Sequence, residues 1–99
     1  MITKETFYAG STKRTGTFTM TAGSKRVQVI NADIDGTLPD ARKLKNGGPC
    51  YYFVNISNYT VAVKYNSGSV LFELESYERA EVCLLDNSTS DGQWFWRKI

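Results

Sequence analysis

The chain has 99 residues, of which 41% are hydrophobic and 13% aromatic, and its formal net charge is +2. This length fits one domain, and the apolar content is too high for a disordered chain. No apolar run approaches the roughly 20 residues that cross a bilayer, and the first residues lack the apolar stretch of a secretory signal. We therefore expect one domain that is made in a cytoplasm and has no membrane segment.

The positive charge is unevenly distributed. Residues 1–45 have eight lysines and arginines against four acids (+4), whereas residues 46–99 have four against six (−2). A basic half can face nucleic acid or an acidic protein surface, but so weak an excess is more often a solvated surface. We expect no nucleic-acid partner, and a small nucleic-acid-binding barrel is kept as a minor alternative.

In chain order, the first half predicts an arm, two strands and a helical turn. Residues 1–14 are interpreted as an extended N-terminal arm because their end is polar and flexible, and residues 15–99 as a single β domain. Strands are expected at 15–21 and 25–31, where residues alternate with the period of two of a half-buried strand. Turn residues dominate 32–49, and a short helical turn is expected near 38–44, where Leu38, Ala41 and Leu44 lie three apart.

The second half consists of short apolar runs separated by Gly, Asn and Ser turns, which is typical of all-β domains. We expect strands there at 50–56, 59–65, 70–75, 80–85 and 93–98. Residues 3–9 could add another. The fold class is therefore an all-β, small antiparallel β-sandwich or barrel of about seven to eight short strands, with one short helical turn.

The two cysteines, Cys50 and Cys83, both lie inside apolar runs. For a chain made in a reducing cytoplasm we expect buried free thiols, and a disulfide only if the two strands meet with suitable geometry.

Catalytic chemistry is poorly represented. The chain has no histidine, which removes the commonest general base and any Ser-His-Asp or Cys-His arrangement. No phosphate-binding glycine loop is present, and Asp33-Ile34-Asp35-Gly36 lacks the further ligands of a calcium loop. The carboxylates are as numerous as on an ordinary surface. We expect no enzyme, no catalytic residues, no cofactor and no metal.

The last expected strand is apolar on both faces. Trp94 and Trp96 share one face and Phe95 takes the other, so both faces need a cover. We interpret Trp94, Phe95 and Trp96 as part core and part subunit interface, and a sugar-stacking platform is the alternative.

From Leu38 to Trp96 the sequence resembles the small β-rich virion domains of tailed bacteriophages, such as head-decoration and tail-fibre modules. The resemblance lies in the order and spacing of four pieces. These are Leu38-Pro39-Asp40-Ala41 before a Gly turn, Tyr52-Phe53-Val54-Asn55-Ile56-Ser57-Asn58, Val61 to Leu71 around Gly68, and Leu85-Asp86-Asn87-Ser88-Thr89 followed by Gly92-Gln93-Trp94. Such domains usually have a Gly-containing turn where this chain has Ser76-Tyr77-Glu78.

The resemblance implies a non-enzymatic virion part, with a homotrimer favoured, that binds the major capsid protein or a tail protein. Because the chain is barely larger than the domain, a capsid decoration or cement protein made in the host cytoplasm fits better than a long fibre. Lys4, Lys13 and Arg14 would then form a docking arm for an acidic shell. The alternative function is a carbohydrate-binding module for host recognition.

Overall fold

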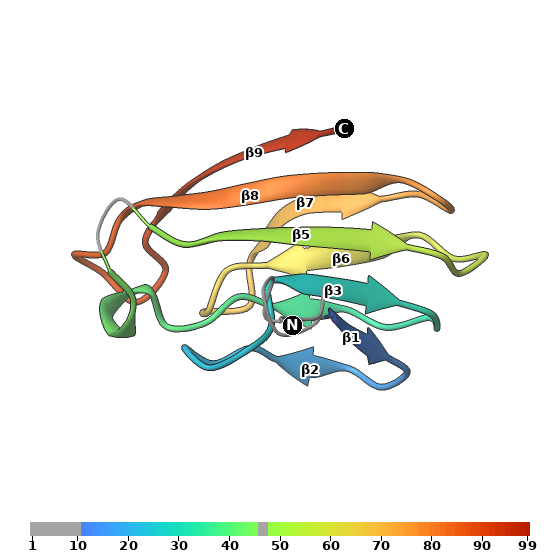
Figure 1. Cartoon of the computed structure of the whole chain (residues 1–99), viewed down its shortest axis with the longest axis horizontal. Helices are drawn as coiled ribbons and strands as arrows, with labels where there is room; N and C mark the ends of the chain where they lie inside the picture. Colours follow the sequence, from blue (N-terminus) through green and yellow to red (C-terminus); the bar gives the residue numbers. More distant parts are fainter. Residues whose placement is uncertain (1–10, 46–47) are drawn as a thin grey trace, which may run out of the picture.

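The computed structural model describes residues 11–45 and 48–99, with side chains from Arg14 onwards, and its strands form two mixed sheets (Figure 1). The five-stranded sheet has the order β1 (Ser11–Arg14), β3 (Val27–Ile30), β5 (Cys50–Asn55), β8 (Arg79–Asp86) and β9 (Gln93–Lys98). The four-stranded sheet has the order β2 (Phe18–Thr19), β4 (Gly36–Thr37), β6 (Val61–Lys64) and β7 (Val70–Leu74). A single 3₁₀ turn, η1 (Ala41–Lys43), lies near residues 38–44, where the sequence predicts a helical turn.

The chain changes sheet after each of its first five strands, and this makes the first half parallel. β1, β3 and β5 pair in parallel in one sheet, while β2, β4 and β6 pair in parallel in the other. Each strand of the opposite sheet acts as the crossover that parallel neighbours require. From β6 onwards the pairs are antiparallel. The expectation of a purely antiparallel fold is therefore wrong for the first half, because its turns join the two sheets and are not hairpins.

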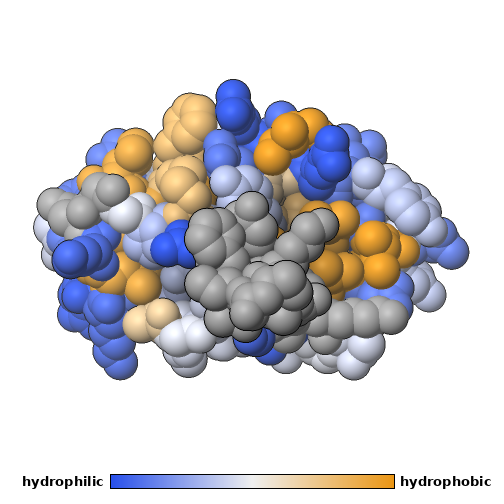
Figure 2. All heavy atoms as spheres, in the orientation of Figure 1, coloured by the Kyte–Doolittle hydropathy of each residue, from blue (hydrophilic) through white to orange (hydrophobic). Residues whose placement is uncertain are grey.

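The core lies between the two sheets, so the fold is sandwich-like and is not a closed barrel. It combines inward residues of both sheets, and Phe53 of β5 meets Phe72 of β7 edge to face, with ring centroids 6.4 Å apart. The face of the molecule seen in Figure 2 mixes apolar with hydrophilic residues.

β4 is a strand that the sequence did not predict. Its Gly36 belongs to an Asp-Gly pair that is typical of a turn, yet it lies opposite Phe18 of β2. A Cβ atom at Gly36 would come within 2.6 Å of the Phe18 ring, so glycine leaves room for that ring in the core.

Two amide side chains are fully buried, and one of them joins the two sheets. The Asn55 side chain has no exposed surface and bonds to carbonyl oxygens of Tyr59, Leu74 and Glu75, which connects the end of β5 to the other sheet. Gln28 is also fully buried, accepts a bond from Arg14 Nε and donates one to the Lys25 carbonyl. Both are polar groups whose burial is compensated by hydrogen bonds.

The loop at 86–92 closes one end of the fold. Ala41 N donates to Ser90 O at 2.9 Å, and both carboxylate oxygens of Asp91 accept bonds from Ser67. Gly92 has a φ of +68°, in the left-handed region that favours glycine. The loop therefore joins η1, the β6–β7 turn and β9.

The expected arm at 1–14 falls largely outside the described residues. Its last four residues form β1, the outermost strand of the five-stranded sheet, which pairs with β3.

Candidate functional site

The candidate site is the end of the five-stranded sheet formed by β8 and β9. β9 pairs with β8 on one side and is the last strand of its sheet, so its other side has no neighbouring strand among the described residues. The three aromatic residues that the sequence assigns to an interface lie on this strand, and the structure gives each a different environment.

Trp94 belongs to the core. Its side chain is 7% exposed and tilted against Tyr51, and its indole Nε1 donates a hydrogen bond to Asp91 O at 2.8 Å. A ring that is covered in this way offers no face to a ligand or partner.

Trp96 connects the two sheets through a ring contact. Its ring stacks on Phe72 of β7, with centroids 4.6 Å apart and planes at 21°, and the residue is still 36% exposed. One face of the indole is thus engaged within the domain.

Phe95 faces outwards, as its alternation with the two tryptophans predicts. It is 50% exposed and lies directly opposite Cys83 of β8. Cys83 in turn pairs with Cys50 of β5, and Leu85 follows on the same face. We call this surface, made by Phe95, Leu85 and the Cys50–Cys83 pair, the outer patch.

The two cysteines form a disulfide, so the expectation of free thiols is wrong in this structure. β5 pairs antiparallel with β8, and the register puts Cys50 directly opposite Cys83 with Cα atoms 4.0 Å apart. The sequence separation of 33 residues gave no sign of this pairing.

Polar groups border the outer patch. Glu81 accepts bonds from Tyr52 Oη at 3.0 Å and from Arg97 Nε at 3.3 Å. The bond to the Glu81 carboxylate raises the pKa of Tyr52, and some burial adds to this. An apolar centre with a polar border is the usual composition of a protein–protein interface.

The three basic residues expected in a docking arm are not brought together by the described structure. Lys4 and the Lys13 side chain lie outside the described part of the chain. Arg14 is committed to the fold, since its Nε donates to Gln28 Oε1 at 2.7 Å and its guanidinium lies 4.2 Å from the centre of the Phe18 ring.

No three metal-binding side chains gather among the described residues. Asp35 accepts the Ala62 amide at 3.0 Å and pairs with Lys64 at 3.0 Å. Burial acts to raise the pKa of Asp35, but the bonds from Lys64 and Ala62 outweigh it and the pKa is lowered. No helix in the described part of the chain is long and apolar enough to cross a membrane.

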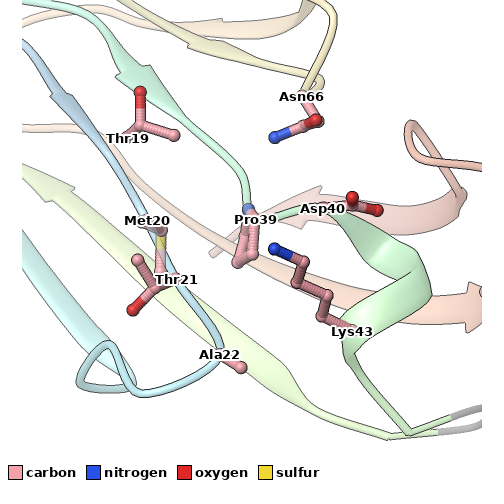
Figure 3. Close-up of a pocket in the computed structure, with 8 residues that line it drawn as sticks. All are labelled: Thr19, Met20, Thr21, Ala22, Pro39, Asp40, Lys43 and Asn66. Carbon is pink, nitrogen blue, oxygen red and sulfur yellow. The ribbon is translucent and has the colours of Figure 1, made fainter.

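A hollow of about 320 Å³ lies at the opposite sheet, next to η1 (Figure 3). Lys43 extends toward Pro39, and the Asn66 amide donates to Leu38 O at 3.3 Å. Arg42 already neutralises Asp40 at 2.9 Å and, by hydrogen bonding, lowers the pKa of that carboxyl. The hollow is therefore lined by both polar and apolar side chains, with one lysine among them, and nothing in the sequence pattern pointed to it.

Comparison with models of known protein families, with curated proteins and with solved structures finds no match to this chain.

Proposed function

We propose that the protein is a non-enzymatic structural part of a bacteriophage particle, a capsid decoration or tail-associated β module that associates with itself and binds the particle. The single observation that carries the proposal is the end of the five-stranded sheet, where one side of β9 has no neighbouring strand among the described residues and an exposed apolar patch lies on the same strand. A repeated particle surface lets such a module gain affinity through many weak contacts, without a polar active site.

The bacteriophage part of the proposal rests on the sequence resemblance and is supported by what its residues do. Three of the four pieces of the resemblance are joined by hydrogen bonds, since the loop at 86–92 bonds to η1 and to the β6–β7 turn. Trp94 is anchored in the core by Asp91 of the same loop. This is a consistent structural role for the loop and its closing tryptophan.

Particles assembled with and without the chain test this proposal. Particles lacking the protein should lose their nucleic acid at a lower temperature. They should also lose it earlier when the ionic strength is lowered stepwise. Adding the purified protein back should restore their stability. The variant Phe95→Ser, which removes the ring of the outer patch, should restore the stability poorly. Tyr77→Ser, which removes an exposed ring elsewhere, is the matched control. Particles of unchanged stability to which the added protein does not bind would sink the proposal.

A carbohydrate-binding module remains the second candidate function, and it would use the hollow beside η1 and not the tryptophans. Trp94 is buried and Trp96 is stacked on Phe72, so the two do not form an open platform. The hydroxyl, amide and ammonium groups around the hollow could bond a small sugar. A glycan array in which Lys43→Ala abolishes every signal would favour this candidate, and an array without signals would remove it.

A further inference from the structure

The free side of β9 presents an orderly row of backbone groups. Ile99 N donates to Arg79 O, and in an antiparallel ladder such bonded positions alternate along the strand. Phe95 and Arg97 therefore direct their amides and carbonyls toward β8. Trp94, Trp96 and Lys98 direct theirs outwards, where the described residues offer no strand to receive them.

This edge lacks most of the devices that usually block strand pairing. β9 is six residues long and contains no proline, and the irregularity in its pairing with β8 lies before Trp94, between Leu84 and Asp86. The other edge of the same sheet, β1, has four residues. A long, regular and partly apolar edge is a template for another strand.

The basic residues at the strand ends determine which strand can pair with the free side of β9. β9 ends in Arg97 and Lys98, and β1 also ends in two basic residues, so head-to-tail addition of β1 to β9 would bring like charges together. Two copies of β9 running antiparallel avoid this. With Trp96 opposite Trp96 of the second copy, Arg97 lies opposite Phe95 and Lys98 lies opposite Trp94.

We propose that two copies of the chain pair through β9 about a twofold axis centred on Trp96, which joins their five-stranded sheets into one continuous sheet. The outward groups of Trp94, Trp96 and Lys98 then form about six hydrogen bonds between the copies. Each Arg97 guanidinium comes beside the exposed ring of the other copy's Phe95, an arrangement that favours cation–π contact. This deepens the self-association in the proposed function and rests on it, and it specifies a dimer where the resemblance implies a trimer.

The register is tested by two pairs of variants whose native mass is measured across a concentration series. Lys98→Pro removes an outward N–H without touching the ladder to β8, whereas Lys98→Ala loses the same side chain and keeps that N–H. The proline variant should raise the dimer dissociation constant about 30-fold, because two hydrogen bonds are lost in each dimer. The alanine variant should change it by less than about threefold.

Phe95→Lys and Phe95→Glu test the facing pairs. Both remove the same exposed ring, but lysine would face Arg97 of the other copy and glutamate would pair with it. The dissociation constant of the lysine variant should exceed that of the glutamate variant about tenfold, and by less at high salt.

A stable trimer, a monomer at every concentration, or a dimer that ignores both pairs of variants would overturn the twofold pairing. Particle binding by a trimer would leave the proposed function standing, so the two can fail separately.

Discussion

The side chain of Asn55 is the best single test of what holds the two sheets together. It has no exposed surface, and it forms hydrogen bonds with backbone groups of the neighbouring segments. Its Nδ2 donates to carbonyls of Tyr59 at 2.6 Å, Leu74 at 3.2 Å and Glu75 at 3.1 Å, and its Oδ1 accepts Ser57 N at 2.9 Å.

Asn55→Ala would leave several of these backbone groups without a partner in the interior. An unsatisfied buried group costs about 1–3 kcal/mol, and water can reach some of them, so we expect a loss of about 3–5 kcal/mol in the free energy of unfolding. Since small domains have about 5–15 kcal/mol in total, this is a large part of the stability.

Urea unfolding followed by tryptophan fluorescence measures this loss as a lower midpoint with an unchanged slope. Asn58→Ala is the matched control, because Asn58 is an exposed asparagine in the adjacent turn, and it should change stability by less than about 0.5 kcal/mol. If the two variants were equally stable, the role assigned to Asn55 would be refuted.

Three further predictions concern the disulfide, a glycine and pH. Protein purified without reductant should show no free thiol, and a thiol titration that finds both cysteines free would contradict the pairing. The double variant Cys50→Ser with Cys83→Ser should lose about 3–4 kcal/mol in the free energy of unfolding, because the disulfide closes a loop with a sequence separation of 33 residues. Gly92→Ala should lower the melting temperature by several degrees, because a Cβ there would lie 2.5 Å from Ala41 Cβ, whereas Gly16→Ala, with open space around it, should change it little. The bond from the Glu75 amide, followed by that from Lys98, lowers the pKa of Glu78 below its ordinary value of 4.5. The stability that Glu78 contributes is therefore present above pH 4.5 and is lost as the pH falls through the lower pKa of the folded state. Glu78→Gln should flatten the plot of unfolding free energy against pH in that acid range, and an unchanged plot would count against this role.

The sequence predicts the second half of the fold well, because its elements are regular and local. Alternation placed strands over 50–56, 70–75 and 93–98, close to β5, β7 and β9. It also placed Phe95 on the opposite face from Trp94, as the structure shows.

The first half could not be predicted in the same way, because its pairing is non-local. Parallel neighbours such as β3 and β5 are joined through a strand of the other sheet, and no local signal distinguishes that crossover from a hairpin. Gly36 was interpreted as a turn residue because the ring of Phe18 that requires it comes from a distant strand. The Cys50–Cys83 pairing was missed for the same reason.

For the candidate site, the sequence predicted which strand has the three aromatic residues, but it could not predict what surrounds each of them. Burial of Trp94 depends on its bond to Asp91 and its contact with Tyr51. The free edge of β9 follows only from the strand order, which alternation cannot give.

The central claim is tested most directly by looking for the chain in phage particles. Particles from cells that carry its gene would be purified by density gradient and analysed by mass spectrometry for its peptides. The proposal predicts that these peptides co-purify with the major capsid or tail protein at a fixed ratio through successive gradients. Their absence from particles, with the protein present in the soluble lysate, would contradict it.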